Sequence, residues 1–133
     1  LIFLLRNKLP KNWKIKPLAN ISDTEFYNYL RKSKLFLSFS YMEGLGAPPI
    51  EAAKEGNKVI GYTGEGGKDY WKKPIFTEIP NGNLDLFMNE IMKFIKSKKS
   101  YSIFSNQRVK LLQKYSSKSE TKSLKILINK ISK

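Results

Sequence analysis

The chain of 133 residues contains no Cys and no His, and its formal net charge at pH 7 is +14. The missing Cys excludes a disulfide framework and thiolate metal sites, and the missing His excludes the most common general base and transition-metal ligand. With 41% apolar and 13% aromatic residues, residues 1–133 are sufficient for a single domain with its own core.

The positive charge is concentrated in the last third of the sequence. Residues 1–90 carry 13 Lys or Arg against 10 Asp or Glu, whereas residues 91–133 carry 12 against 1. Such a charge favours polyanions such as nucleic acid or anionic lipid. Only Arg6, Arg31 and Arg108 are arginines. These are too few for a protein that recognises bases and phosphates through bidentate Arg contacts, so we do not expect nucleic acid as a partner. A solvated basic face without a dedicated partner is the simpler interpretation.

The chain begins without Met on the apolar run LIFLL (1–5), so we expect a fragment of a longer protein. This run predicts a short buried strand, and KIKPL (14–18) predicts a weaker one. No apolar run approaches the ~20 residues that span a bilayer, and the start of the chain lacks the features of a signal peptide. We therefore expect a cytoplasmic location.

The segments that follow alternate between helix and strand. A capping box, Ser22 with Glu25, predicts a helix over 22–33, and KLFLSFS (34–40) predicts a buried strand. A second helix is expected from near Pro48 to Gly56, and strands are expected at KVIGY (58–62) and PIFTEI (74–79), with a loop between them. This alternation predicts an α/β fold with a Rossmann-like, open, mainly parallel sheet flanked by helices.

Beyond Asn83 the apolar residues follow a helical period to the end of the chain. We expect amphipathic helices whose apolar faces pack on their own protein, with basic helices at a membrane surface as the alternative. The residues of these stripes are Leu84, Phe87, Ile91, Phe94 and Ile95, then Leu111, Leu112 and Tyr115, then Leu124, Leu127, Ile128 and Ile131.

The stretch SYMEGLGAPPIEAAKEGNKVIGY (40–62) places Glu43 and Glu51 on either side of a tight turn. In open parallel sheets, ligands bind beyond the carboxyl ends of the strands, where this turn would lie. Gly44 and Gly46 would let the backbone approach a phosphate or sugar, and each carboxylate could accept neighbouring hydroxyls. Alternatively, Glu51 is a helix N-terminal carboxylate and Glu43 a solvated turn residue. The third glycine of the dinucleotide fingerprint is replaced by Pro49, which disfavours a dehydrogenase.

Residues 43–67, EGLGAPPIEAAKEGNKVIGYTGEGG, resemble the Glu-x7-Glu signature in the C-terminal domain of retaining GT-B glycosyltransferases. Glu43 and Glu51 match the two glutamates, and the likeness extends over the preceding helix and strand and the closing helix. It therefore covers nearly the whole chain. The other residues in register are Gly44, Leu45, Gly46, Pro48, Ala52, Gly56, Val59 and Ile60.

The resemblance implies that this chain is the donor-binding half of such an enzyme. Glu43 would then approach the hydroxyls of the donor sugar, and Glu51 would hold the ribose of the nucleotide. The backbone of Gly44, Leu45 and Gly46 would face the diphosphate and sugar. The family packs the base near the positions of Leu18 and Ala19, and Lys68 is a candidate phosphate contact, with an ordinary surface lysine as the alternative.

By the same resemblance, the full enzyme transfers a hexose from a nucleotide-diphosphate sugar to a glycan or lipid-linked acceptor, with retention and with neither a bound metal nor another cofactor. We expect the catalytic residues and acceptor site in an N-terminal domain absent from this chain, so that the fragment alone is inactive. The basic end would suit the inner face of an anionic membrane. Two alternatives stay open: a non-catalytic α/β module that binds membrane or nucleic acid through residues 91–133, and an inactive relative retained for assembly.

Overall fold

A parallel β-sheet forms the centre of the protein. The computed structural model describes residues 1–40, 44, 46–97 and 105–131. Within these residues the sheet has three strands, β1 (Leu35–Ser38), β2 (Lys58–Gly61) and β3 (Phe76–Glu78), in the order β1-β2-β3. Both pairings are parallel, and Ser38 and Gly61 are partners at the carboxyl end of the first pair. The predicted Rossmann-like α/β fold is confirmed.

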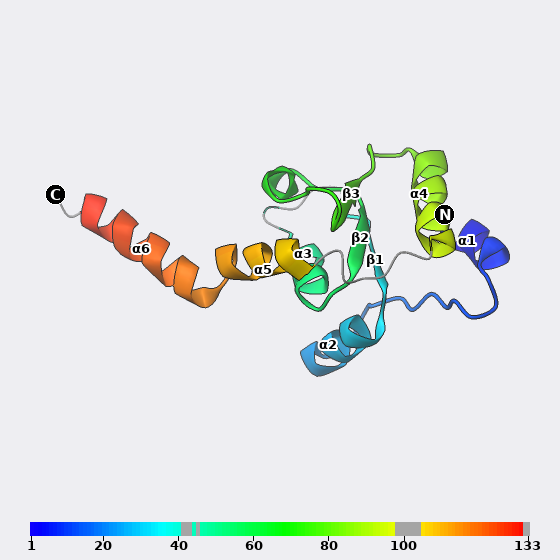
Figure 1. The fold of residues 1–133 in the computed structure, drawn as a ribbon, viewed down its shortest axis with the longest axis horizontal. Coiled ribbons are helices and arrows are strands. Elements are labelled where there is room, and N and C mark those ends of the chain that lie inside the picture. The colour runs from blue at the N-terminus through cyan, green and yellow to red at the C-terminus, as the bar shows by residue number, and fades with distance from the viewer. Residues whose placement is uncertain (41–43, 45, 98–104, 132–133) are drawn as a thin grey trace.

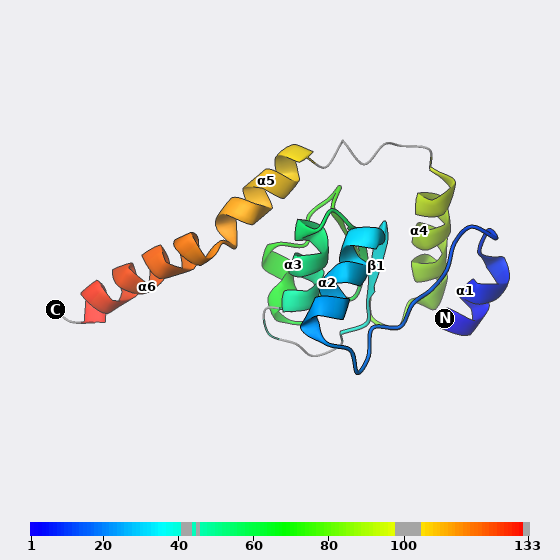
Figure 2. The ribbon, with the colours of Figure 1, turned by 90° about the horizontal axis from the view of Figure 1, so that it is seen from below.

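Helices cover both faces of this sheet (Figure 1). Helices α2 (Asp23–Lys32) and α3 (Ala47–Lys54) lie on one face, while α1 (Ile2–Lys8) and α4 (Leu84–Lys96) lie on the other, as Figure 2 shows. Successive strand side chains point to opposite faces. Val59 accordingly joins the core under α2 and α3, whereas Ile60 joins the core under α1 and α4.

The local signals for α2 and α3 act as expected. The side chain of Ser22 accepts a hydrogen bond from the backbone N–H of Glu25, whose carboxylate accepts one from the N–H of Ser22, which completes the capping box. At the end of α3, Gly56 has a φ of +96° and donates to the carbonyl of Ala53, and Asn57 donates to that of Ala52. This pair of bonds is a Schellman motif, which ends the helix.

The C-terminal part consists of two successive helices. Helix α5 (Ser105–Lys114) packs against α3, and α6 (Ser117–Ile131) extends away from the sheet (Figures 1 and 2). A short 3-10 helix, η1 (Gly66–Asp69), occupies the predicted loop between β2 and β3.

The predicted strand at 1–5 is wrong, because this run forms α1. Leu1 and Leu5 are four residues apart, so a helix brings both to the core beside α4. The last turn carries Arg6 and Lys8, and Pro10 follows the C-cap, all of which suit a helix end. Residues 14–18 are not a strand either: within the described residues they pair with no strand, although Ile15 and Leu18 pack on the two cores.

The predicted packing of the last apolar stripe is also wrong for the described part of the chain. No residue of α6 is buried. The stripe at Leu124, Leu127, Ile128 and Ile131 is exposed to between 52% and 75%. Among the described residues, no helix is long and apolar enough to cross a membrane.

Gly61 allows β1 and β2 to pair closely at the carboxyl end of the sheet, where Ser38 is its partner. A Cβ at this position would lie 1.9 Å from the carbonyl oxygen of Ser38, and its φ is +151°. We expect Gly61→Ala to lower the free energy of unfolding by about 3 kcal/mol or more, through clash and backbone strain together, as measured by urea denaturation. Gly82→Ala is the control, since Gly82 has a φ of +80° but open space around it. Equal losses in both variants would contradict the close approach.

Lys58 is a buried cation at the other end of β2. Its ammonium donates to the carbonyl oxygen of Pro74 and, over 2.7 Å, to the hydroxyl of Thr77. Desolvation by burial lowers the pKa of Lys58 from 10.5 to about 8, with Lys73 acting in the same direction and Glu90 opposing them. Between these two values the unfolded chain binds more protons at this group than the folded chain does. Its contribution to stability therefore rises with pH from about 8 to about 10.5.

We expect this pH dependence to disappear in Lys58→Met. The free energy of unfolding of the unsubstituted chain, minus that of Lys58→Met, should rise by up to about 1.4 kcal/mol per pH unit across that interval. Urea denaturation at several pH values measures the difference. Lys72→Met, which removes an exposed lysine nearby, controls for the loss of one cation. A flat difference for Lys58→Met would contradict the burial of a charged group.

Candidate functional site

The candidate site lies at the start of α3, beyond the carboxyl end of β1. Gly46 precedes the helix with a φ of +65°, a left-handed conformation that costs a non-glycine residue roughly 1–2 kcal/mol. The hydroxyl of Tyr70 donates to the carbonyl oxygen of Gly46 over 2.9 Å and fixes the turn from the segment that follows β2. Pro48 and Pro49 lack a backbone N–H, so this turn offers a phosphate fewer donors than an ordinary helix start.

Glu51 lies one turn into α3 and is half-buried. Its carboxylate accepts a hydrogen bond of 2.9 Å from the hydroxyl of Tyr27, which belongs to α2. This contact raises the pKa of Tyr27, and burial and the negative charges of Glu51, Asp23 and Glu55 add to the effect. The phenol therefore remains a neutral donor well into the alkaline range.

A pocket of about 330 Å³ opens beside Glu51, between α3 and the α5–α6 junction. One wall is a single face of α3, formed by Ala47, Ile50, Glu51 and Lys54. The other wall consists of residues around the α5–α6 junction: Lys114, Tyr115, Ser116, Ser119, Glu120 and Ser123. Two carboxylates, two ammonium groups and several hydroxyls thus share one small space.

The charges of this lining cancel, since two are negative and two are positive. A neutral site rich in hydroxyls, with an aromatic ring and carboxylates, suits a ligand that carries many hydroxyls. Both lysines lie against Tyr115. The ammonium of Lys54 donates to the Tyr115 carbonyl over 2.8 Å, and that of Lys114 lies 5.2 Å from the centre of the Tyr115 ring.

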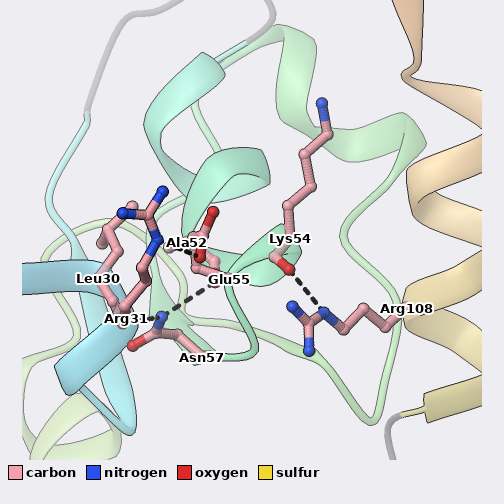
Figure 3. Close-up of polar contacts among 7 residues, drawn as sticks. All are labelled: Leu30, Arg31, Ala52, Lys54, Glu55, Asn57 and Arg108. Carbon is pink, nitrogen blue, oxygen red and sulfur yellow. Dashed lines mark hydrogen bonds and ion pairs between the residues drawn. The ribbon is translucent and has the colours of Figure 1, made fainter. Parts of the chain in front are cut away.

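The two walls are tied together at the C-terminal end of α3, as Figure 3 shows in part. From α5, Arg108 donates to the carbonyl oxygen of Lys54 over 2.6 Å. From α3, the ammonium of Lys54 donates to the carbonyl oxygen of Tyr115, just beyond the end of α5.

Helix α2 is joined to the same end of α3. Its Arg31 forms an ion pair of 3.3 Å with Glu55. The buried amide of Asn57 donates to the carbonyls of Leu30 and Ala52, which joins the ends of α2 and α3.

The predicted site residues fall into three groups. Gly46 and Glu51 lie at the start of α3 as expected, and Gly44, which is exposed, precedes them. Glu43 and Leu45 lie outside the described residues. Leu18, Ala19 and Lys68 do not line the pocket.

The residues of the third group have other surroundings. Leu18 packs against the core beneath α2 and α3, and Ala19 is exposed. Lys68, on η1, forms an exposed ion pair of 3.7 Å with Glu65. Within the described ranges, no group of three Asp or Glu side chains is arranged to hold a metal ion.

Several residues of the pocket, and the partner Tyr27 of Glu51, were not found from the sequence. Lys54 follows Glu51 by three residues on the same helical face, a spacing that predicts its proximity. Tyr27, Lys114 and Tyr115 give no such signal, since they reach the site only because α2 and α5 pack beside α3.

The sequence is similar to that of a curated bacterial enzyme. It is 30% identical to the poly(glycerol-phosphate) alpha-glucosyltransferase of Bacillus subtilis over 115 residues, which cover 82% of this chain. This similarity relates the chain to a glycosyltransferase. The chain spans only 16% of the length of that enzyme. No protein-family profile and no solved structure matches the chain.

Proposed function

We propose that this chain is the part of a GT-B glycosyltransferase that binds a nucleotide-diphosphate sugar, and that Glu51 accepts hydrogen bonds from the ribose hydroxyls. The observation that carries this proposal is the position of Glu51. Its half-buried carboxylate follows the carboxyl end of a parallel strand, is held by Tyr27 and lines a pocket of polar groups. The similarity to a glucosyltransferase over most of the chain supports a sugar nucleotide as the ligand.

In the reaction that we propose, a hexose passes to a glycan or lipid-linked acceptor with retention at the anomeric carbon. The acceptor site and the catalytic residues would belong to another part of the protein. Loss of the nucleoside diphosphate leaves negative charge on the departing phosphates, which enzymes can neutralise with positioned cations. Although the lining as a whole is neutral, we propose that Lys54 and Lys114 act locally as these cations and that donor binding requires no metal ion.

We expect Glu51→Gln to weaken the binding of the matching UDP- or GDP-hexose about tenfold or more, because hydrogen bonds to a charged acceptor are worth about 1.5–3 kcal/mol. Isothermal titration calorimetry of the 133-residue chain, with a panel of UDP- and GDP-hexoses, measures this change. Glu55→Gln is the matched control. Glu55 caps the same helix and pairs with Arg31, but it does not line the pocket.

Two results would contradict the proposed function. The first is that the folded, unsubstituted chain binds no nucleotide sugar of the panel. The second is that Glu51→Gln and Glu55→Gln weaken binding equally, because the carboxylate of Glu51 would then have no special role.

We also propose that α6 contacts an anionic membrane, a partner that one observation favours. Its apolar stripe at 124, 127, 128 and 131 is exposed along its full length. At 100° per residue, Lys125 and Lys130 lie on opposite sides of this stripe, and Glu120 is the single acidic residue of the helix. Exposed apolar residues flanked by lysines match a helix that lies in a lipid interface and attracts anionic headgroups.

Two isoleucines of α6 provide a matched test of this contact. Ile128 lies in the stripe and Ile126 lies on the opposite face, with exposed fractions of 58% and 49%. We expect Ile128→Ser to reduce co-sedimentation with phosphatidylglycerol vesicles several-fold and Ile126→Ser to leave it nearly unchanged. Phosphatidylcholine vesicles should bind neither variant. Equal effects of the two variants, or self-association of the chain in place of vesicle binding, would contradict a membrane as the partner.

A further inference from the structure

The hydroxyl of Tyr27 forms a hydrogen bond with one of the two carboxylate oxygens of Glu51 at the candidate site. The hydroxyl of Tyr27 donates to Oε1 of Glu51 over 2.9 Å, across 24 residues of sequence. A carboxylate can accept several hydrogen bonds, so the one from Tyr27 leaves acceptor capacity for a ligand in the pocket that Glu51 lines. The same bond restricts the rotation of the Glu51 side chain.

The Tyr27 side chain is itself held in place. Its ring packs against Phe26 in an edge-to-face arrangement, with centroids 5.6 Å apart, and lies against the core beneath α2 and α3. Helix α2 is joined to α3 by the amide of Asn57, which donates to Leu30 over 2.8 Å. Because Asn57 is almost fully buried, this join has little freedom to move. Tyr27 therefore presents its hydroxyl to Glu51 from a fixed support.

We propose that Tyr27 is a positioning residue that orients Glu51 toward the ribose hydroxyls of the bound nucleotide, and so contributes to the selection of ribose over 2′-deoxyribose. This inference rests on the proposed function. A carboxylate that accepts two neighbouring hydroxyls must lie in one orientation to reach both of them. When the hydrogen bond from α2 is lost, Glu51 still binds but must lose rotational freedom on binding, at a cost in affinity.

Calorimetric titration with two pairs of ligands tests this role. The ligands are UDP with 2′-deoxy-UDP and GDP with 2′-deoxy-GDP, added to the 133-residue chain. We expect Tyr27→Phe to lower the affinity for the ribonucleotide about 3- to 10-fold, the usual range for one lost hydrogen bond. Affinity for the deoxynucleotide should change less, so the ratio between the two should fall. A residue that served only the stability of α2 would change both affinities by the same factor.

Tyr29→Phe is the matched control. Tyr29 belongs to the same helix and is also half-buried, but its ring lies beneath the ammonium of Lys16, 5.0 Å away, and it does not contact Glu51. We expect this variant to retain both the ribonucleotide affinity and the ratio. Thermal unfolding of the two variants checks that each one folds.

A double-mutant cycle with Glu51→Gln provides a second readout. Because Tyr27 is proposed to act through the Glu51 carboxylate, Tyr27→Phe should weaken ribonucleotide binding much less in the Glu51→Gln background than in the unsubstituted chain. Full additivity, or an unchanged ribose-to-deoxyribose ratio in folded Tyr27→Phe, would overturn the positioning role and leave the proposed function standing. Absence of nucleotide binding by the unsubstituted chain would overturn both.

Discussion

The position of α3 is the constraint on which the candidate site depends. At its start, the left-handed conformation of Gly46 and the hydrogen bond from Tyr70 define where the helix begins. At its end, the Schellman motif, the amide of Asn57 and the guanidinium of Arg108 satisfy carbonyls that the helix leaves open. A short helix of eight residues is thus fixed at both ends, which sets the Cα–Cβ direction of Glu51, and the hydrogen bond from Tyr27 holds its carboxylate.

The same contacts assemble the pocket. Arg108 binds the end of α3 from α5, and Lys54 binds the end of α5 from α3, so that the two walls hold each other through reciprocal hydrogen bonds. The rings of Tyr115 and Tyr70 make an edge-to-face contact, with centroids 5.8 Å apart, and the hydroxyl of Tyr70 donates to the carbonyl of Gly46. The region between α5 and α6 is thereby linked to the start of α3.

The basic end of the chain has two parts with different surroundings. Helix α5 packs against α3, and α6 exposes its apolar stripe.

Much of this architecture could be predicted from local signals in the sequence. The capping box of Ser22 and Glu25, the positive φ of Gly56 and the apolar runs of β1 and β2 each depend on neighbouring residues, although only β2 is buried along its whole length. The strand predicted for the first five residues was wrong, because an all-apolar run carries no period that separates strand from helix. Packing beside α4 favours the helix there, because a helix brings Leu5 into the core.

The partners of Glu51 depended on contacts that the sequence does not encode locally. Tyr27 is 24 residues away and reaches the carboxylate only because α2 and α3 share one face of the sheet. The far wall of the pocket comes from residues beyond position 113, which join it through the packing of α5 on α3. Sequence patterns therefore located the start of α3, and tertiary packing determined which side chains meet there.

A crystal structure of the 133-residue chain with a bound nucleoside diphosphate would test the central claim most directly. We expect both ribose hydroxyls to lie within hydrogen-bonding distance of the Glu51 carboxylate, and Tyr27 still to donate a hydrogen bond to this carboxylate. A nucleotide bound elsewhere on the chain, with Glu51 contacting only Tyr27 and solvent, would contradict it.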